Sequence, residues 1–309
     1  MFDIEKIKGP IATIITPFKE NSNEIDEDAL RKEIRFLAES DIAGLFPLAT
    51  TSEFPYMSLE TKEKYVKIVS EENAGRKALT VGCCGVNYTE SMQLLEIAAK
   101  YHADAAVICA PYYYGKGSDE LYRYYTALAA NPWGVKIIMY NIPDCTSEIP
   151  MDAVEKLVKN PNIVGIKDSS GNMRRIRNTV DFKGDRKDFV VYVGNDDIIL
   201  PALAAGAEGS MSVMSTVTPE IVAKIFEEFK KGNIAEADKH QQSYLALCRA
   251  SNKIPFPAAF KMVAKARGMN AGFYHQLFDE ELGKEVEAEM KAYTEELAAK
   301  YGFTDSMGK

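Results

Sequence analysis

Long apolar runs are missing from this sequence. No stretch approaches the roughly 20 consecutive apolar residues that a membrane-spanning helix needs. The opening residues, MFDIEKIKGP, carry charges where a signal peptide has its apolar core. We therefore expect a cytoplasmic protein with no membrane partner.

Cysteine is scarce and scattered. The five cysteines, Cys83, Cys84, Cys109, Cys145 and Cys248, form no C-x-x-C pair and have no histidine cluster beside them. Their number is odd, so neither a disulfide framework nor a zinc site is indicated. We expect small core residues in a reducing compartment, with Cys145, in a polar turn, as the exception. No metal or cofactor is predicted.

A stripe of basic residues is also missing. The formal net charge is -8, and the 37 lysines and arginines are scattered through segments with helical spacing. Nucleic acids and anionic membranes bind basic patches, so neither is an expected partner. Small molecules are the better candidates.

What the sequence does contain is a series of short apolar runs separated by charged segments with helical spacing. Eight runs predict strands, and they begin at Pro10, Ile42, Lys77, Ala105, Val135, Ile163, Phe189 and Gly209. Strands that are apolar on both faces and alternate with amphipathic helices indicate a parallel sheet covered by helices.

The eight repeats favour closure into a (β/α)8 barrel, the TIM barrel of the α/β class. An open doubly wound sheet is the alternative, but no G-x-G-x-x-G follows the first run. Four further helical segments follow the eighth run, and the first of them closes the barrel. We predict a catalytic barrel over residues 1–231 and a helical extension over residues 232–309, which serves as a cap or an oligomer surface.

Polar residues end several of the runs, where the reactive groups of such barrels lie. These residues are Thr50 and Thr51 after the second run, Tyr112 to Tyr114 after the fourth, Tyr140 and Asn141 in the fifth, Lys167 and Asp168 in the sixth, and Asn195 to Asp197 in the seventh. Lys167 is the only basic residue among them.

Lys167 has two interpretations. A lysine amine in a partly desolvated pocket has a lowered pKa and can condense with a ketone to a Schiff base. The protonated imine then stabilises a carbanion on the neighbouring carbon, as aldol cleavage requires. The alternative is an ion pair with Asp168 or Asp197 that holds the barrel rim together. The run alone does not separate the two.

Tyr140 and the threonine pair are similarly ambiguous. The Tyr140 phenol could shuttle protons, or its ring could simply pack with a hydrated hydroxyl. Thr50 and Thr51 could grip a carboxylate with hydroxyl and backbone N–H groups. They could equally form a helix N-cap with Glu53 as the capping partner.

Several motifs together resemble the pyruvate-dependent aldolase family, which includes dihydrodipicolinate synthase, N-acetylneuraminate lyase and 2-keto-3-deoxygluconate aldolase. ATIITPF resembles the first strand of this family, and LATTSEF stands where it has a G-T/S-T-G-E turn. YNIP is similar to its Y-N-V/I-P motif, and GIKDSSGN to its G-I/V-K motif. IPFPAAFKMVAKARGM resembles its C-terminal extension, so the motifs cover most of the chain.

The resemblance implies a role for each candidate. Lys167 would be the Schiff-base lysine and Tyr140 the proton-relay phenol. Thr50 and Thr51 would bind the carboxylate of pyruvate. Tyr113 would reach into the site of a neighbouring subunit to extend the relay. The assembly implied is a homotetramer, a dimer of dimers.

Three departures from the family pattern bear on the substrate. Ala49 and Ser52 replace the two glycines of the family turn, which matters if either position needs a left-handed backbone or a close approach. Cys145 stands where the synthases carry an arginine for the carboxylate of their aldehyde substrate, and a thiol cannot make that bidentate contact. Val213 aligns with a hydroxyl residue of the neuraminate lyases.

The remaining polar residues would form an outer pocket for the second substrate: Asp144, Cys145, Thr146, Ser169, Asp196 and Asp197. Each could instead be a hydrated rim residue or a helix cap. Carboxylates and hydroxyls suit a polyhydroxylated chain better than a second carboxylate.

We therefore predict a lyase that cleaves a 2-keto-3-deoxy sugar acid, or a related 4-hydroxy-2-oxo acid, reversibly to pyruvate and an aldehyde through a Schiff base. The alternatives are a synthase such as dihydrodipicolinate (4-hydroxy-tetrahydrodipicolinate) synthase, a dehydratase using the same imine, and N-acetylneuraminate lyase. An alternative of another class is a barrel that binds pyruvate without turnover.

Overall fold

The structure is a computed structural model that describes residues 2–303. The chain forms two compact units. Unit 1 comprises the described residues up to Ile11, then Ala43–Pro47 and Lys77–Ser212. Unit 2 comprises Ala12–Ile42, Leu48–Arg76 and the described residues from Val213 onward. The expected boundary between residues 231 and 232 lies inside unit 2, and that division stays a prediction.

The strands close into a parallel barrel in sequence order from β1 to β8, which confirms the predicted TIM barrel. They are β1 (Gly9–Thr13), β2 (Gly44–Phe46), β3 (Ala78–Gly82), β4 (Ala105–Cys109), β5 (Ile137–Asn141), β6 (Ile163–Asp168), β7 (Val190–Val193) and β8 (Gly209–Ser212). Apart from Gly9, every strand residue is buried. A strand between the barrel interior and a helix layer has no solvent face, which explains the continuous apolar runs.

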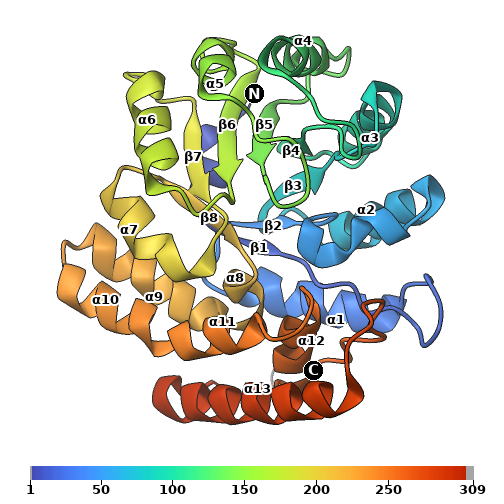
Figure 1. Ribbon diagram of the computed structural model, residues 1–309, viewed down its shortest axis with the longest axis vertical. Coiled ribbons are helices and arrows are strands. Elements are labelled where there is room, and N and C mark those ends of the chain that lie inside the picture. The colour runs from blue at the N-terminus through green and yellow to red at the C-terminus, as the bar shows by residue number, and fades with distance from the viewer. Residues whose placement is uncertain (1, 304–309) are drawn as a thin grey trace. The chain divides into compact units, whose positions relative to one another are not determined.

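Helices alternate with the strands of unit 1, and α3 to α6 flank the outer side of the sheet (Figure 1). They are α3 (Tyr88–Lys100), α4 (Ser118–Ala129), α5 (Met151–Leu157), α6 (Met173–Lys183) and α7 (Ile199–Ala204), with 3-10 turns η1 (Ile4–Ile7) and η4 (Asp196–Ile198). Asn87 and Asn172 cap α3 and α6 by accepting backbone N–H groups of their first turns. These caps start the helices directly after the loops that follow β3 and β6.

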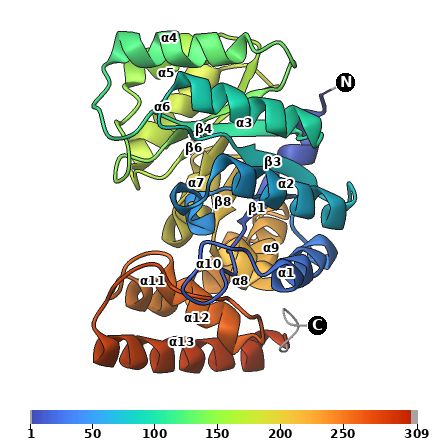
Figure 2. The same cartoon turned by 90° about the vertical axis from the view of Figure 1, so that its right-hand side faces the viewer.

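Apart from the end of β1 and the isolated bridges of Phe18, the described part of unit 2 consists of helices and loops. Its helices are α1 (Glu27–Glu39), α2 (Leu59–Asn73), α8 (Met214–Val217), α9 (Pro219–Lys230), α10 (Ile234–Ser243), α11 (Leu245–Ser251), α12 (Ala258–Ala266) and α13 (Glu280–Tyr301), with 3-10 turns η2 (Thr50–Ser52) and η3 (Phe54–Tyr56). The long helix α13 packs along α11 and α12 (Figure 2). Gly302, with φ 72°, ends α13 in the left-handed conformation that glycine permits.

One predicted helix is interrupted. The segment from Ile234 to Ala250 divides at Tyr244, where φ -111° and ψ 4° leave the helical region. The Tyr244 ring is fully buried, and its hydroxyl accepts a hydrogen bond from Gln241. Within residues 2–303, no helix is both long enough and apolar enough to span a bilayer.

Candidate active site

Lys167 is the fifth residue of β6, and its register partner on β5 is Tyr140. The ammonium nitrogen lies 4.1 Å from the centroid of the Tyr140 ring and 5.1 Å from that of Phe46, at the end of β2. The two rings meet edge to face, with centroids 6.4 Å apart. Two aromatic rings therefore face the lysine nitrogen at the carboxyl ends of three strands.

Burial determines the charge state of Lys167. The residue is 4% exposed, and this burial lowers the pKa of its amine to about 7. The Asp196 carboxylate opposes the shift, because negative charge nearby favours the ammonium form. A lysine with this pKa is largely uncharged just above neutral pH and can attack a carbonyl.

The rim ion pair considered for Lys167 is not formed. Asp168 Oδ2 accepts a hydrogen bond from Asn141 Nδ2 at 3.0 Å and pairs with Arg175 Nε at 3.2 Å. Its Oδ1 accepts the N–H and the hydroxyl of Ser170. Within the described chain, no carboxylate forms an ion pair with Lys167. Asp168 instead ties the end of β6 to its neighbours.

Gly194, directly after β7, makes room for the lysine side chain. A Cβ atom at this position would lie 2.9 Å from Lys167 Cε and would overlap Ser169 Oγ. The Gly194 N–H donates to the Asp168 carbonyl at 2.8 Å, which fixes this close approach. Gly194 and Phe46 were not predicted as site residues. The only signals in the sequence were a glycine and an aromatic residue at strand ends.

The predicted outer-pocket residues follow β5, β6 and β7. Asp144 and Cys145 are exposed in the loop after β5, and Thr146 is half-buried. Ser169 and Asp196 are half-buried after β6 and β7. Asp197, beside Asp196 in η4, is exposed. Their roles in substrate binding stay predictions.

The loop after β5 is held at both ends. Asn141 Oδ1 accepts the Ile149 N–H at 2.9 Å, and Arg175 Nη2 donates to the Ile149 carbonyl at 2.8 Å. Arg175, on α6, is nearly buried and also pairs with Glu148 at 3.1 Å. This arginine was not anticipated, because MRRIRN reads simply as a charged helix start.

The threonine pair lies in unit 2, in the 3-10 turn η2. Thr51 is buried, with its hydroxyl 3.0 Å from the Thr13 hydroxyl, whereas Thr50 is half-buried. Ser52 Oγ donates to the Ile14 carbonyl at 2.7 Å and accepts the Ala49 N–H at 3.1 Å. Ser52 therefore fills the capping role considered for Glu53.

The two missing glycines do not strain this turn. Ala49 has φ -73° and ψ 172°, which any residue adopts. Ser52 is not among the positive-φ residues; the left-handed positions are Leu48 at φ 57° and Glu53 at φ 56°. A serine in the turn adds hydrogen bonds that a glycine could not make.

Tyr113 lies in the loop between β4 and α4 and is 90% exposed. Its φ of 81° is unusual for a residue with a Cβ and indicates a constrained loop. The ring packs edge to face against that of Tyr114, with centroids 5.0 Å apart. Both tyrosine side chains are therefore exposed on the surface of the isolated chain.

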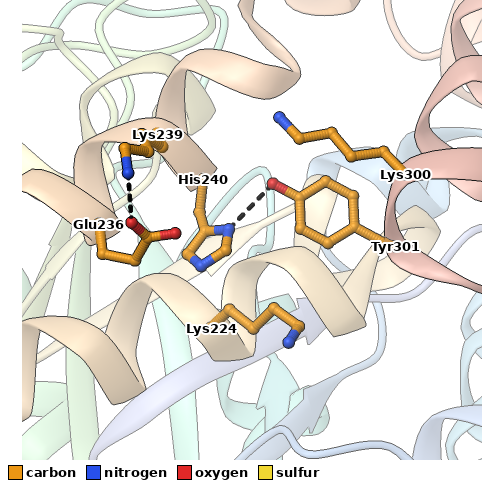
Figure 3. A pocket seen from close by; sticks show the side chains of 6 residues that line it. All are labelled: Lys224, Glu236, Lys239, His240, Lys300 and Tyr301. Carbon is orange, nitrogen blue, oxygen red and sulfur yellow. Dashed lines mark hydrogen bonds and ion pairs between the residues drawn. The ribbon is translucent and has the colours of Figure 1, made fainter.

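A second group of ionisable side chains lines a surface pocket of unit 2 (Figure 3). It consists of Lys224, Glu236, Lys239, His240, Lys300 and Tyr301. His240 Nδ1 lies 2.9 Å from the Tyr301 hydroxyl, and burial lowers the pKa of this histidine. The three lysines are exposed, so they lack the desolvation that makes Lys167 nucleophilic.

Comparisons with known proteins converge on one family. The sequence model of the Dihydrodipicolinate synthetase family matches residues 6–296. A 4-hydroxy-tetrahydrodipicolinate synthase of Methanothrix thermoacetophila is 34% identical, over 84% of this chain and 88% of its own. An uncharacterized DapA-like lyase of Pyrococcus horikoshii is 32% identical, over 85% of this chain and 91% of its own.

Solved structures agree on the architecture. Dihydrodipicolinate synthase from Aquifex aeolicus superposes with a TM-score of 0.86 at 30% identity, covering 93% of this chain and 98% of that one. A Ruminococcus gnavus sialic acid aldolase, altered at its catalytic lysine, gives 0.88 at 20% identity, covering 97% and 100%. The latter likeness concerns the fold alone.

Proposed function

Because this chain belongs to the dihydrodipicolinate synthetase family of class I, pyruvate-dependent carbon–carbon lyases, we propose that it cleaves a 2-keto-3-deoxy sugar acid, or a related 4-hydroxy-2-oxo acid, reversibly to pyruvate and an aldehyde. The observation that carries the proposal is the buried Lys167 amine, with a pKa of about 7. We assign it as the Schiff-base nucleophile.

The proposed cleavage begins with attack of the neutral Lys167 amine on the C2 carbonyl. The resulting carbinolamine takes the proton of the Tyr140 phenol and loses water, which leaves a protonated imine and a Tyr140 phenolate. The Tyr140 phenolate takes the proton of the C4 hydroxyl, and the C3–C4 bond breaks. The electron pair of that bond moves into the imine to form an enamine, and the aldehyde leaves. Protonation at C3 and hydrolysis then release pyruvate and restore the amine.

We assign the carboxylate of pyruvate to Thr50 and Thr51. The hydroxyl and N–H groups of a tight turn provide donors suited to a carboxylate. Support comes from the rigidity of the turn, which Ser52 holds with two hydrogen bonds. Hydrogen-bond donors that are already fixed bind a carboxylate without the entropy cost of being ordered on binding.

The residues around the outer pocket favour a polyhydroxylated second substrate. Cys145 offers a neutral thiol where a synthase holds a second carboxylate with arginine. Asp144, Asp196 and Asp197 would repel such a carboxylate and could accept hydrogen bonds from sugar hydroxyls. Thr146 and Ser169 could serve the same hydroxyls.

A synthase that condenses pyruvate with aspartate semialdehyde is the second candidate. It is favoured by the names of relatives such as the Methanothrix thermoacetophila protein. A panel of 2-keto-3-deoxy sugar acids, read by pyruvate release, should be run beside condensation assays with the semialdehyde. Turnover of the semialdehyde alone would reverse our ranking of the two.

The imine itself is tested by trapping. Incubation with pyruvate and borohydride should add one reduced pyruvate group to the chain, located at Lys167 by peptide mapping. Lys167→Ala should abolish the adduct. An unmodified wild-type chain, or an adduct at another lysine, would end the Schiff-base assignment.

A further inference from the structure

Glu53 directly follows the turn that we assign to the pyruvate carboxylate. Its backbone is left-handed, with φ 56° and ψ 34°, a conformation unfavourable for a residue with a Cβ. The side chain is 1% exposed and is held at both oxygens. Oε1 lies 2.5 Å from Lys261 Nζ, and Oε2 accepts a hydrogen bond from Gln276 Nε2 at 2.9 Å. These contacts hold the strained end of the turn.

The partner lysine comes from α12, in the C-terminal part of unit 2. Lys261 is 0% exposed, donates to the Phe273 carbonyl at 2.8 Å, and lies 5.2 Å from the centroid of the Phe18 ring. Removing a cation from water is costly unless its partner is well placed. This lysine therefore depends on Glu53, just as Glu53 depends on it.

A second carboxylate, that of Glu33, acts electrostatically on Lys261 but forms no ion pair with it in the described chain. Glu33, on α1, is fully buried, and this burial raises the pKa of its carboxyl well above the usual range. Its Oε1 accepts the Ile15 N–H at 3.0 Å, while Oε2 has no hydrogen-bond partner among the described residues. Within the part of the chain that the structure describes, Glu53 is therefore the carboxylate that forms an ion pair with Lys261.

Three further side-chain anchors of the turn are uncharged hydrogen bonds. Thr16 Oγ1 donates to the Ser52 carbonyl at 2.7 Å, Ser52 Oγ donates to the Ile14 carbonyl, and Thr51 meets Thr13. These bonds all join the turn to the chain that continues from β1. The Glu53–Lys261 pair instead joins it to the C-terminal helices.

We propose that Lys261 is a positioning residue for pyruvate: its buried ion pair with Glu53 fixes the Thr50–Ser52 turn, so the C-terminal segment sets the affinity for the carboxylate. This inference rests on the proposed function, which assigns the carboxylate to that turn. It extends the determinants of pyruvate binding to a residue that touches no substrate atom.

The test is Lys261→Met, which keeps an apolar stem of similar length but removes the ammonium group and leaves Glu53 without its ion-pair partner. We expect the pyruvate concentration that half-saturates borohydride trapping to rise about tenfold or more, because small displacements of binding groups have large effects. The trapping rate at saturating pyruvate should stay within about threefold of wild type, since Lys167 itself is unchanged.

The matched control is Arg267→Met at the end of the same helix. Arg267 is also a buried cation, 1% exposed, but it pairs with Glu220 at 2.7 Å and donates to the Val217 carbonyl at 2.7 Å. Its replacement should lower the melting temperature and leave half-saturation by pyruvate unchanged. Glu53→Gln, which removes the charge but keeps the shape, is the second variant if Lys261→Met does not fold.

The outcomes separate the two proposals. Failure of the wild-type chain to form the adduct would overturn the proposed function. A wild-type adduct combined with equal half-saturation in the Lys261 and Arg267 variants would overturn the positioning role alone. The intact protein offers a further check: saturating pyruvate should slow hydrogen exchange in residues 258–276, and unchanged exchange would also contradict the inference.

Discussion

Lysine side chains usually keep their ammonium groups in water, even where their stems are buried. The Lys167 nitrogen faces the rings of Tyr140 and Phe46 instead of water or a paired carboxylate. Burial removes the ammonium group from water, and an aromatic face attracts a cation too weakly to compensate. The neutral amine is therefore favoured, and its pKa falls to about 7. The nucleophilicity that we assign to this residue is thus a consequence of its position in the barrel.

The pH dependence of imine formation tests this position. The attacking form is the neutral amine, so the trapping rate should rise with pH through about 7 and then level off. A lysine with the ordinary pKa of 10.5 would give a rate still rising at pH 9. The measurement is the initial rate of borohydride trapping with pyruvate from pH 5 to about pH 10.

The Asp196 carboxylate raises the pKa of Lys167, so Asp196→Asn should move the midpoint of this profile to lower pH. Asp197→Asn is the matched control, because Asp197 is exposed and does not act on the lysine. A wild-type midpoint above pH 9 would contradict the desolvated amine.

Gly194→Ala tests the space around the lysine. The added methyl group would lie 2.9 Å from Lys167 Cε and overlap Ser169 Oγ, so the lysine must shift. We expect the trapping rate to fall about 100-fold, because small misplacements of reacting groups are costly. Gly117→Ala, where a methyl group meets nothing within 4 Å, should leave the rate unchanged. Equal rates in the two variants would show that the lysine can move freely.

At the scale of elements, the site depends on how the strand ends are joined. Arg175 on α6 pairs with Asp168 at the end of β6 and donates to the Ile149 carbonyl at the end of the β5 loop. A single guanidinium thereby ties a helix, a strand and a loop together. The ends of that loop are buried and fixed, and they position the exposed residues between them, which include Cys145.

Arg175→Met should lower the free energy of unfolding by about 3 kcal/mol, because it leaves the buried Asp168 carboxylate without its cation. Urea denaturation measures the change. Arg177→Met on the same helix is the control: Arg177 is 60% exposed in its pair with Asp181, and its loss should cost less than about 0.5 kcal/mol. Similar losses in both variants would contradict a special role for Arg175.

The strands and the strand-end residues could be predicted from local sequence patterns, whereas contacts between distant segments could not. The barrel strands were predictable because strands buried on both faces read as continuous apolar runs, and Lys167 and Tyr140 stood out because they end such runs. The division of a predicted helix at Tyr244 was not predictable, because helical periodicity does not show where a large aromatic ring will be buried. The pairing of Glu53 with Lys261 and the tight space at Gly194 depend on distances between segments far apart in sequence.

At the scale of the whole molecule, the proposed assembly is a homotetramer arranged as a dimer of dimers. Tyr113 is 90% exposed on a constrained loop, and we propose that a neighbouring subunit receives it. Large exposed aromatic residues are typical of binding surfaces. In that assembly the proton relay would need a second copy of the chain.

Tyr113→Phe should therefore lower turnover about 100-fold, in the range of a lost acid–base group. Tyr114→Phe, the exposed neighbour, should stay within about threefold of wild type. Light scattering should give the mass of four 34.3 kDa chains. A single-chain mass with full activity of the Tyr113 variant would contradict both the assembly and the relay.

The loop after β5 has a consequence for how this protein can evolve. Its two ends are fixed by Asn141, Arg175 and Ile149, while Asp144 and Cys145 between them are exposed. Natural selection can therefore exchange the exposed residues without disturbing the strands that carry Lys167 and Tyr140. If these residues contact the aldehyde as we propose, a descendant could accept a new aldehyde after a few substitutions in one short segment, and a laboratory library should begin there.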